Sequence, residues 1–384
     1  MCPTGSVMTA EKIADLLETL VNIPSETGHE GPVADWLAGR LQRVVEQRGG
    51  EVLRVAHSLV WRARPRGRPL VLLAGHLDTV PANGNARARR ESERIYGLGS
   101  SDMKGGDAVM LALAESLDAE RARFDLALVF YEAEEGPPER SGLRMLLERL
   151  PWLEHARLAI LLEPTSLRVE VGCIGSLNAE VTVTGKSAHS ARPWLGVNAV
   201  GRAADWLAEV TRFPVTPVRV QGIDFRETLQ VTTLRAGRAR NVVPDELVAN
   251  LNYRFPPDRT LEQAEARLRE LVPAEFEFRV ADRAAPGAVC ADRPEVQEFV
   301  RRFGATVAGK QGWTDVARFT AAGVAAFNFG PGIPEQAHQA GGYCPIENLE
   351  RAYRWLGEFL AAEGGGHPAE PGPAGPGPAE PDPA

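Results

Sequence analysis

The sequence predicts an α/β fold, a central mixed sheet flanked by helices, into which a smaller ferredoxin-like α+β domain is inserted. Three observations lead to this prediction. Short, wholly apolar runs alternate with helical stretches over the first half of the chain, as is typical of strands buried on both faces. From residue 177, apolar and polar residues alternate as in an open antiparallel sheet. The first pattern returns near residue 294, so the middle unit is an insertion.

The length of the chain accommodates two domains. It has 384 residues, of which 44% are hydrophobic and 24% are charged, and each domain can bury a core of its own. We expect the first domain to comprise residues 8–175 and 287–363, and the inserted domain residues 176–286. The end of the chain, residues 364–384, consists almost entirely of Gly, Pro, Ala and acidic residues, so we expect a disordered tail.

The elements of the first domain follow from hydrophobic periodicity. Two helices, separated by a break at Ile23-Pro24-Ser25, are predicted between residues 10 and 48. Apolar runs predict four buried strands, at 70–74, 126–131, 158–162 and 325–329. Helical spacing predicts three further helices, at 107–117, 294–303 and 349–361.

The elements of the inserted domain have a recognisable order. Alternating patterns predict strands at 177–184, 228–234, 246–255 and 275–281, and helical spacing predicts helices at 198–211 and 261–271. The resulting order β-α-β-β-α-β is that of a ferredoxin-like unit.

Composition and charge exclude several classes of protein. The net charge of −8 disfavours nucleic acid or an anionic membrane surface as the main partner. No apolar run reaches the roughly 18 residues of a membrane-spanning helix, and the first residues lack the regions of an export signal. The four cysteines lie far apart and form no Cys-x-x-Cys pair, so we expect them to be reduced. We therefore expect a cytoplasmic protein.

Polar residues follow the predicted strands where each strand ends, which is where open α/β sheets place their sites. His and acidic residues follow all four buried strands, and another lies in a glycine-rich segment that leads into a helix. These residues are His76, Asp78, Asp102, Glu134, Glu135, Glu163 and His338. Such a convergence of metal-ligand types predicts a metal site.

Each of these residues alone has a simpler interpretation. A lone His at a strand end is more often structural, and the pair Glu134-Glu135 alone is more often solvated. The segment 97–106 is rich in glycine, but it lacks the residue order of a phosphate-binding loop. Because the five segments occupy corresponding places in one α/β domain, a metal site explains them together.

The spacing of these residues supports this interpretation. His76 and Asp78 are two residues apart, so on an extended backbone both project to the same side. Asp78 can then accept a hydrogen bond from the imidazole nitrogen that faces away from a metal. Glu134 and Glu135 are adjacent and point different ways, so one can bind a metal while the other holds a water. Asp102 can offer its two oxygens to two ions.

Five short motifs that contain these residues resemble those of a known family. They are the segments 75–81 (Gly-His-Leu-Asp-Thr-Val-Pro), 101–105 (Ser-Asp-Met-Lys-Gly), 134–136 (Glu-Glu-Gly), 163–164 (Glu-Pro) and 337–338 (Ala-His). Together they resemble the M20 family of dinuclear zinc peptidases and deacylases, over residues 10 to 362. The resemblance implies a zinc-exopeptidase-like catalytic domain.

The resemblance also implies roles for the clustered residues, with two zinc ions per subunit, for which cobalt or manganese can substitute. One zinc ion would be held by His76, Asp102 and Glu163, and the other by Asp102, Glu135 and His338. Glu134 would be the general base that takes a proton from the attacking water and delivers it to the leaving amine. Asp78 would orient His76.

The inserted domain corresponds to the lid and dimerisation domain of the family, which implies a homodimer and a small N-acyl amino acid as substrate. His189, in the segment 187–191 (Ser-Ala-His-Ser-Ala), would reach the active site of the other subunit as an oxyanion donor. Asn241 and Arg254 would bind a substrate carboxylate, and Thr314 and Arg318 belong to another substrate-facing segment. Without the resemblance, His189 is a surface hairpin residue and Arg254 a member of a cross-strand ion pair.

Four stretches, at 128–132, 188–199, 253–259 and 312–319, resemble the actinobacterial succinyl-diaminopimelate desuccinylases. This branch removes the succinyl group from N-succinyl-LL-2,6-diaminopimelate in lysine and diaminopimelate biosynthesis. Acetylornithine deacetylases, amino-acid carrier hydrolases and glutamate carboxypeptidases share the chemistry and stay open as alternatives. A non-catalytic scaffold predicts the loss of a ligand or of the base, and the sequence shows neither. Gly341-Gly342 replaces an acidic residue that many family members carry after the last His.

Overall fold

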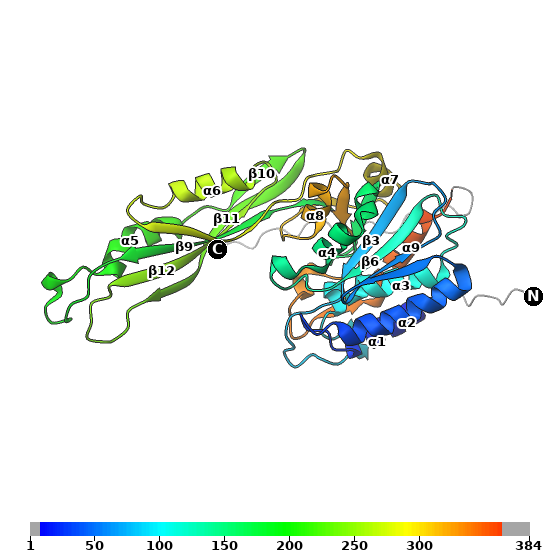
Figure 1. Cartoon of the computed structure of the whole chain (residues 1–384), viewed down its shortest axis with the longest axis horizontal. Helices are drawn as coiled ribbons and strands as arrows, with labels where there is room; N and C mark the ends of the chain where they lie inside the picture. The colour runs from blue at the N-terminus through cyan, green and yellow to red at the C-terminus, as the bar shows by residue number, and fades with distance from the viewer. Residues whose placement is uncertain (1–7, 363–384) are drawn as a thin grey trace, which may run out of the picture.

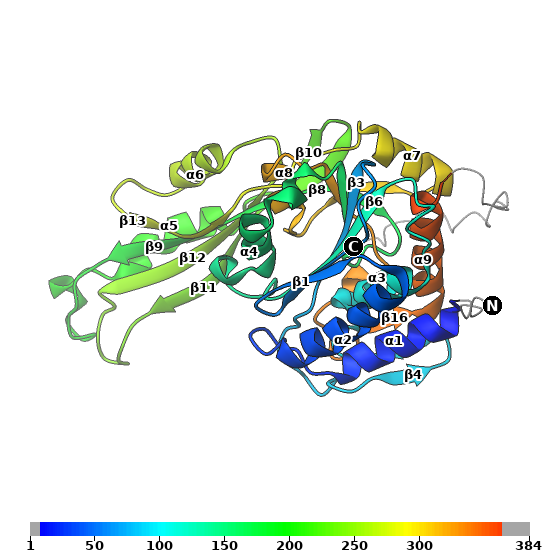
Figure 2. The same cartoon turned by 45° about the vertical axis from the view of Figure 1, so that its right-hand side comes forward.

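A computed structural model of the chain describes residues 8–362, and the tail expected at 364–384 lies outside them. Within this range the chain forms an eight-stranded mixed sheet, in the order β1-β2-β6-β3-β7-β15-β8-β14, and a five-stranded antiparallel sheet, in the order β10-β11-β12-β9-β13. Figures 1 and 2 show the five-stranded sheet extending away from the eight-stranded sheet as an arm. The α/β prediction with an inserted antiparallel unit is confirmed.

The strands of the eight-stranded sheet come from both parts of the first domain. They are β1 (Glu51–Val55), β2 (Ser58–Arg62), β3 (Leu70–His76), β6 (Asp125–Tyr131), β7 (Leu158–Leu161), β8 (Val169–Cys173), β14 (Val307–Lys310) and β15 (Ala326–Asn328). The central strands β6, β3, β7 and β15 are parallel, and the antiparallel pairs lie at β1–β2, β2–β6 and β15–β8. The carboxyl ends of four neighbouring strands therefore meet at one edge.

Helices cover both faces of this sheet, which explains the continuous apolar runs. One face packs on α1 (Ala10–Asn22), α2 (Gly31–Arg48), α3 (Gly105–Ser116), α7 (Pro294–Phe303) and α9 (Ile346–Leu360). The other face packs on α4 (Gly142–Arg149) and α8 (Val316–Ala321). Along β3, Val71 and Leu73 belong to the first core, whereas Leu72 and Ala74 belong to the second. A strand buried on both faces has no polar side, so its sequence does not alternate.

A small third sheet belongs to the first domain. It consists of β4 (Arg89–Glu91), β5 (Arg94–Tyr96) and β16 (Tyr343–Pro345), in the order β16-β5-β4. This sheet brings the segment before Asp102 next to the segment after His338. The sequence did not predict its three-residue strands, because such short runs carry no periodicity.

The inserted unit has the predicted order with one additional strand. Its elements are β9 (Gly175–Thr184), α5 (Ala199–Val210), β10 (Thr216–Val220), β11 (Ile223–Ala236), β12 (Glu246–Phe255), α6 (Leu261–Glu270) and β13 (Glu277–Ala284). Both helices pack on one face, over a core that includes Leu177, Ala179, Leu251 and Tyr253. The opposite face is polar. The sequence did not predict β10, which pairs antiparallel with β11 at the edge of the sheet.

The hairpin of β10 and β11 anchors the inserted unit on the first domain. Phe225 of β11 is fully buried in the core of the first domain. A Cβ atom on Gly309 of β14 would lie 2.7 Å from the Phe225 ring, so a glycine is required for this close packing. The two domains thus meet at a packed joint in addition to their two chain connections.

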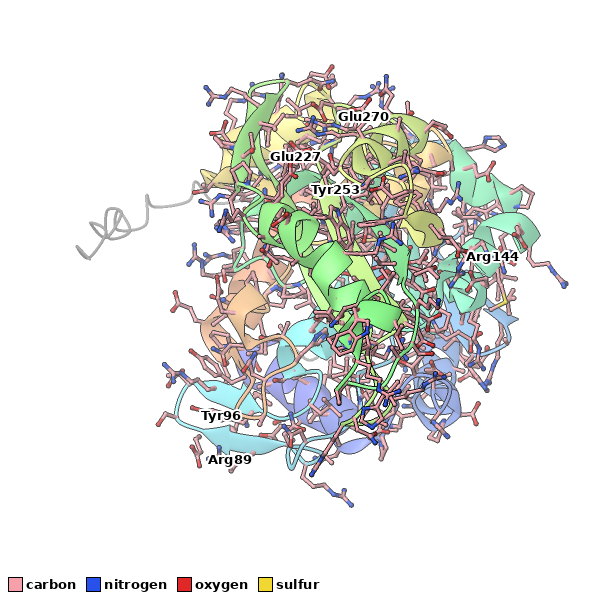
Figure 3. The ribbon with its side chains drawn as sticks, turned by 90° about the vertical axis from the view of Figure 1, so that its left-hand side faces the viewer. Arg89, Tyr96, Arg144, Glu227, Tyr253 and Glu270 are labelled. Atoms are coloured by element: carbon pink, nitrogen blue, oxygen red, sulfur yellow. The ribbon has the colours of Figure 1, made fainter. Side chains whose placement is uncertain are left out.

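A buried ion cluster holds the inserted unit together. Glu227 of β11 is 2% exposed, and it accepts hydrogen bonds from the Tyr253 hydroxyl, from Nη1 of Arg259 at 2.9 Å and from Nε of Arg267 at 2.7 Å. Figure 3 labels Glu227 and Tyr253 close to each other, in agreement with their hydrogen bond. The burial of Glu227 by itself raises its pKa, but its three donors outweigh this effect and lower the pKa.

Three cysteines of the described residues, Cys173, Cys290 and Cys344, are buried, and none of them forms a disulfide. Burial raises the pKa of each thiol. None of the helices within residues 8–362 combines the length and the hydropathy of a bilayer-spanning segment.

Candidate metal centre and active site

Neighbouring parallel strands deliver the predicted ligands to one edge of the sheet. His76 is the last residue of β3 and lies in register with Tyr131, the last residue of β6. The loop after β6 carries Glu134 and Glu135, and Glu163 follows the end of β7 by two residues. The topology therefore brings these segments to the edge that the sequence predicts.

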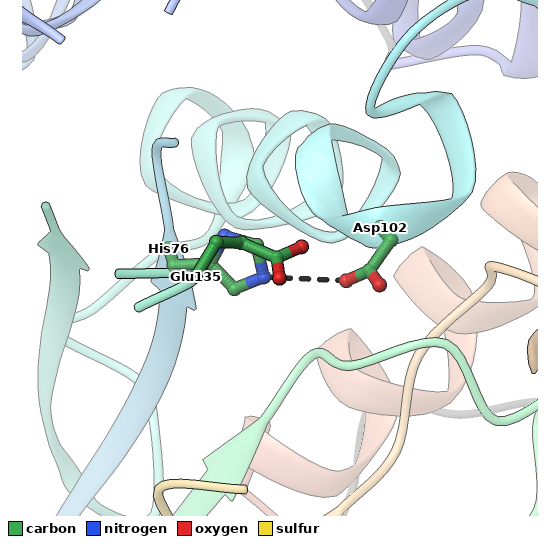
Figure 4. A group of neighbouring side chains, drawn as sticks. All are labelled: His76, Asp102 and Glu135. Atoms are coloured by element: carbon green, nitrogen blue, oxygen red, sulfur yellow. Dashed lines mark hydrogen bonds and ion pairs between the residues drawn. The ribbon is translucent and has the colours of Figure 1, made fainter. Parts of the chain in front are cut away.

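The carboxylate of Asp102 lies between two imidazoles. Its Oδ1 is 3.2 Å from Nε2 of His76, and its Oδ2 is 3.6 Å from Nε2 of His338. Nε2 of His338 also lies 2.7 Å from Oε1 of Glu135. Each of His76, Asp102 and Glu135 offers a ligand atom, and these three atoms lie within 4.8 Å of one another (Figure 4). A carboxylate that faces two imidazoles in this way is suited to bridge two metal ions.

The segment that carries Asp102 is fixed from several sides. Asp102 lies in the segment Ser100–Lys104, immediately before α3, where its own backbone is extended (φ −126°, ψ 96°), and its peptide bond to Met103 is cis. Lys104 is buried, and its Nζ donates to the carbonyl oxygens of Leu20, at 3.0 Å, and Ile23, at 2.9 Å, at the end of α1. These bonds join the Asp102 segment to the end of the first helix, where the carbonyl of Leu20 also accepts from the N–H of Ile23 at 3.2 Å.

His338 occupies a strained backbone position. Its φ angle is +59°, in the left-handed region that residues other than glycine rarely adopt. Hydrogen bonds between Ser101 and the surrounding loop hold this segment in place, because the Ser101 hydroxyl donates to the carbonyl of Tyr343 and accepts from the N–H of Ile333. Such strain is characteristic of functional sites.

Two buried carboxylates accept hydrogen bonds from three consecutive N–H groups of the Glu134 loop. The N–H of Glu134 donates to Oδ1 of Asp78 at 2.9 Å, and the N–H of Glu135 donates to Oδ2 at 3.0 Å. The preceding N–H, of Ala133, donates to Oε1 of Glu30 at 3.2 Å. Ala133 has a φ angle of +55°, so this loop also contains a strained residue. The loop that carries the predicted base is therefore tightly constrained.

Glu30 and Thr27 were not among the site residues predicted from the sequence. Glu30 is 1% exposed and also accepts from the N–H of Gly28, and the Thr27 hydroxyl donates to Oδ2 of Asp78 at 2.9 Å. Both residues lie between α1 and α2, far from the motifs in sequence. The only signal was the helix break at residues 23–25.

Asp78 contacts His76 mainly through its backbone. Nδ1 of His76 lies 3.0 Å from the carbonyl oxygen of Asp78 and 3.5 Å from its Oδ1. Nε2 is therefore the nitrogen that faces Asp102. The predicted orienting role of Asp78 stays a prediction, and the stronger contacts of its side chain are those to the Glu134 loop.

The electrostatics of the site reflect a high density of carboxylates. Burial alone lowers the pKa of His76, but the carboxylates of Asp102 and Asp78 outweigh it and raise this pKa well above its usual range. Burial raises the pKa of Glu134. Burial, together with the charge of Asp102, raises the pKa of Glu163 to about 7. These carboxylates repel one another, so cations stabilise them.

Glu163 provides the test of whether the residues fit a metal pair. Its side chain is 5% exposed, and its Oε1 forms no hydrogen bond with any residue between 8 and 362. A buried carboxylate oxygen without a donor is costly unless a cation satisfies it. The donor set of imidazoles and carboxylates is one that zinc prefers. The residues therefore fit the implied metal ions.

Comparison with known proteins decides the family. The profile of peptidase family M20/M25/M40 matches residues 72–362. The chain belongs to this family.

Individual relatives and a solved structure are similar to this M20 chain. A Mycobacterium tuberculosis protein named "Putative succinyl-diaminopimelate desuccinylase DapE" is 38% identical over 348 residues, which cover 90% of this chain and 97% of that protein. The succinyl-diaminopimelate desuccinylase of Corynebacterium glutamicum is 36% identical over 90% of this chain and 95% of that protein. The structure of a dinuclear metal-binding M20 peptidase from Bacillus subtilis superposes with a TM-score of 0.67 at 15% identity, over 91% of this chain and 97% of that one.

The inserted domain of this M20 chain separates the predicted lid residues into two groups. Arg254 lies at the end of β12 that adjoins the first domain. His189 and Asn241 lie at the opposite end, where the backbone of His189 pairs with Val242 and the N–H of Ser190 donates to the carbonyl of Asn241 at 2.9 Å. Ten residues of β9 separate the two ends, about 30 Å. Figure 1 shows the outer end directed away from the first domain.

The structure places Thr314 and Arg318 near the start of α8. Thr314 is 3% exposed, and its hydroxyl forms no hydrogen bond with a described residue. Nε of Arg318 donates to Oδ1 of the buried Asp315 at 2.6 Å, and its guanidinium lies 5.4 Å from the ring centroid of Trp313. Arg318 is thus held by its own neighbours. Its substrate-binding role stays a prediction.

Proposed function

We propose that this chain is a metal-dependent amidohydrolase that removes the succinyl group from N-succinyl-LL-2,6-diaminopimelate, giving succinate and LL-diaminopimelate. The reaction class is supported by membership of the M20 family and by the cluster of His76, Asp102 and Glu135. The substrate is supported by relatives that are 36–38% identical over nine-tenths of the chain.

The position of Asp102 between two imidazoles is the observation that carries the proposal. His76, Asp102 and Glu163 would hold one zinc ion, and Asp102, Glu135 and His338 the other. Bound zinc ions would supply Lewis acidity to the scissile carbonyl and to a water molecule. The protein itself contributes a rigid ligand frame, because hydrogen bonds fix the loops that carry Asp102, Glu135 and His338.

Glu134 would move the proton. Its backbone is fixed by Asp78, and burial raises its pKa, as is required of a carboxylate that accepts a proton near neutral pH. The water oxygen bonds to the carbonyl carbon, the C–N bond breaks, and the proton taken by Glu134 passes to the leaving nitrogen. Succinate then carries the water oxygen and diaminopimelate carries the new amine.

The placement of His189 supports a homodimer. Because His189 and Asn241 lie at the outer end of the inserted domain, they would serve the metal centre of a second subunit rather than their own. Trp194 and Leu195, in the same loop, are 75% and 56% exposed, and an interface that covers them would bury this apolar surface.

The experiment that tests the proposed function measures which product incorporates the oxygen atom of the attacking water. Zinc-loaded enzyme is incubated with N-succinyl-LL-2,6-diaminopimelate in H₂¹⁸O, and both products are analysed by mass spectrometry, with Glu134→Gln as the control. We expect one ¹⁸O atom in succinate and none in diaminopimelate. Absence of succinate from the wild-type reaction would contradict the substrate.

A further inference from the structure

A row of polar side chains crosses the open face of the inserted domain. Asn252 of β12 lies opposite Asn178 of β9, and Asn178 lies opposite Asp282 of β13. These side chains are on the face that α5 and α6 leave uncovered, because the neighbouring residues Leu177 and Ala179 point into the helix-covered core. Arg254 follows Asn252 by two residues and shares its face.

Hydrogen bonds connect this row to the guanidinium of Arg254. Nε of Arg254 donates to Oδ1 of Asn252 at 3.0 Å, and Nδ2 of Asn252 donates to Oδ1 of Asn178 at 2.9 Å. Nδ2 of Asn178 faces Oδ2 of Asp282 at 3.5 Å. A guanidinium has only donors and a carboxylate only acceptors, so the two amides between them are oriented in one direction.

The two terminal nitrogens of Arg254 remain available for hydrogen bonds to a ligand. Nη1 and Nη2 form no hydrogen bond or ion pair with any residue that the structure describes, and the cross-strand ion pair considered from the sequence is absent among these residues. The side chain is half-buried; burial lowers its pKa, the charge of Asp282 partly opposes this, and the guanidinium stays charged at neutral pH. A partly desolvated cation of this kind favours an anionic partner.

We propose that Asn252, held by Asn178, is a positioning residue that occupies Nε of Arg254 and so directs the Nη1–Nη2 edge toward a carboxylate of the substrate. This inference rests on the proposed function, which supplies an N-acyl amino acid with a carboxylate beside the cleaved amide. Two parallel N–H···O bonds fit that edge of a guanidinium. The Arg254 guanidinium is oriented before the substrate binds, so its side chain loses less conformational freedom on binding.

The amide at position 252 matters because it is neutral. A carboxylate there would pair with Nε and neutralise the guanidinium, and the substrate carboxylate would then meet less positive charge. A methyl group there would leave Nε without a partner and free the guanidinium to rotate. Asn252→Asp and Asn252→Ala therefore test charge and orientation separately.

Asn250 provides a matched control. It lies on the same strand and the same face, and its Nδ2 donates to Oδ1 of Asn178 at 3.1 Å and to the hydroxyl of Thr232 at 2.7 Å. No hydrogen bond joins Asn250 to Arg254 among the described residues. Asn250→Ala removes a comparable amide from the row without touching the guanidinium.

The measurement compares two substrates for each variant. One is N-succinyl-LL-2,6-diaminopimelate, and the other is its analogue with a carboxamide in place of the carboxylate beside the cleaved amide. The ratio of their kcat/KM values reports recognition of that carboxylate. We expect Asn252→Ala to lower this ratio about tenfold, mainly through KM, and Asn252→Asp to lower it at least as much. Asn250→Ala should keep the ratio within about twofold.

A second readout does not depend on the substrate. Crystal structures of the wild-type protein and of Asn252→Ala should differ in the direction of the Arg254 guanidinium, whereas Asn250→Ala should leave it unchanged. An Asn252→Ala variant with the wild-type ratio and an unmoved guanidinium would overturn the proposal. If the wild-type enzyme prefers another N-acyl amino acid, the proposed substrate fails, and the same acid-to-carboxamide ratio on the preferred compound still decides the role of Asn252.

Discussion

The backbone N–H of Glu134 donates a hydrogen bond to Oδ1 of Asp78 over 2.9 Å. This bond joins the end of β3 to the loop after β6, and Asp78 is fully buried where it forms. Because the other carboxylate oxygen accepts from Glu135, one aspartate fixes both the predicted base and the predicted metal ligand beside it. Asp78 therefore fixes the backbone of the Glu134 loop, in addition to its predicted role toward His76.

Replacement of Asp78 by Asn should lower kcat strongly. The substitution keeps the size of the side chain but turns one acceptor into an NH₂ group that faces a backbone N–H. A misplaced base costs about 100-fold in rate, so we expect at least that loss in steady-state assays. Asp35→Asn, on an exposed aspartate, is the control. A kcat within tenfold of wild type for Asp78→Asn would refute this positioning role.

Glu134 and Glu135 should respond differently to substitution, although they are adjacent. Glu134→Gln should lose nearly all turnover and keep both metal ions, because Glu134 supplies no ligand in the proposed scheme. Glu135→Ala should lose one metal ion. Activity assays combined with elemental analysis of each purified variant separate the two roles. Turnover of Glu134→Gln within tenfold of wild type would show that another group is the base.

Removal of metal should abolish activity. We expect two zinc ions per subunit in active protein, loss of turnover on dialysis against a chelator, and recovery with zinc, cobalt or manganese. Elemental analysis before and after dialysis is the measurement, and dialysis without chelator is the control. Full activity in protein that holds only trace metal would be incompatible with this centre.

Much of the fold and of the site could be predicted from the sequence, because buried strands and their polar ends leave a strong local signal. The run at β3 and the residues His76 and Asp78 after it are an example. The support of the site could not be predicted, since Glu30 acts on Ala133 across 103 residues and only the folded chain brings them together. The left-handed backbone of His338 could not be predicted either, since only a few per cent of residues other than glycine adopt that conformation.

Two inactive variants should complement each other if His189 acts across a dimer. A hybrid of His189→Ala and Glu134→Gln subunits contains one site with both residues intact. Mixing the two proteins under conditions of subunit exchange should restore up to about half of the wild-type turnover per hybrid dimer, whereas each variant alone stays inactive. A fully active wild-type monomer, detected by sedimentation at the assay concentration, would rule out the shared site.

The ion cluster around Glu227 should make the inserted domain sensitive to acid. Because the folded protein lowers the pKa of Glu227 below its ordinary value of 4.5, the cluster stabilises the fold above that pH and loses this contribution as the pH falls through the lowered pKa. Glu227→Gln should lower the free energy of unfolding by about 3 kcal/mol at pH 7, and by less at pH 4. Calorimetry beside exposed Glu246→Gln measures this. If Glu227→Gln lowered the free energy of unfolding by the same amount at pH 7 and at pH 4, the assignment would be contradicted.

The most direct test of the proposed function is a comparison of kcat/KM values on zinc-loaded enzyme. The substrates are N-succinyl-LL-2,6-diaminopimelate, acetylornithine, acetyllysine and a glutamyl dipeptide. A site with several buried polar anchors rejects substrates that lack the matching groups by factors of about 10⁴. We expect succinyl-diaminopimelate to exceed each of the other three by a factor of that order. More efficient turnover of any of the three would leave the family and the chemistry in place and contradict the substrate.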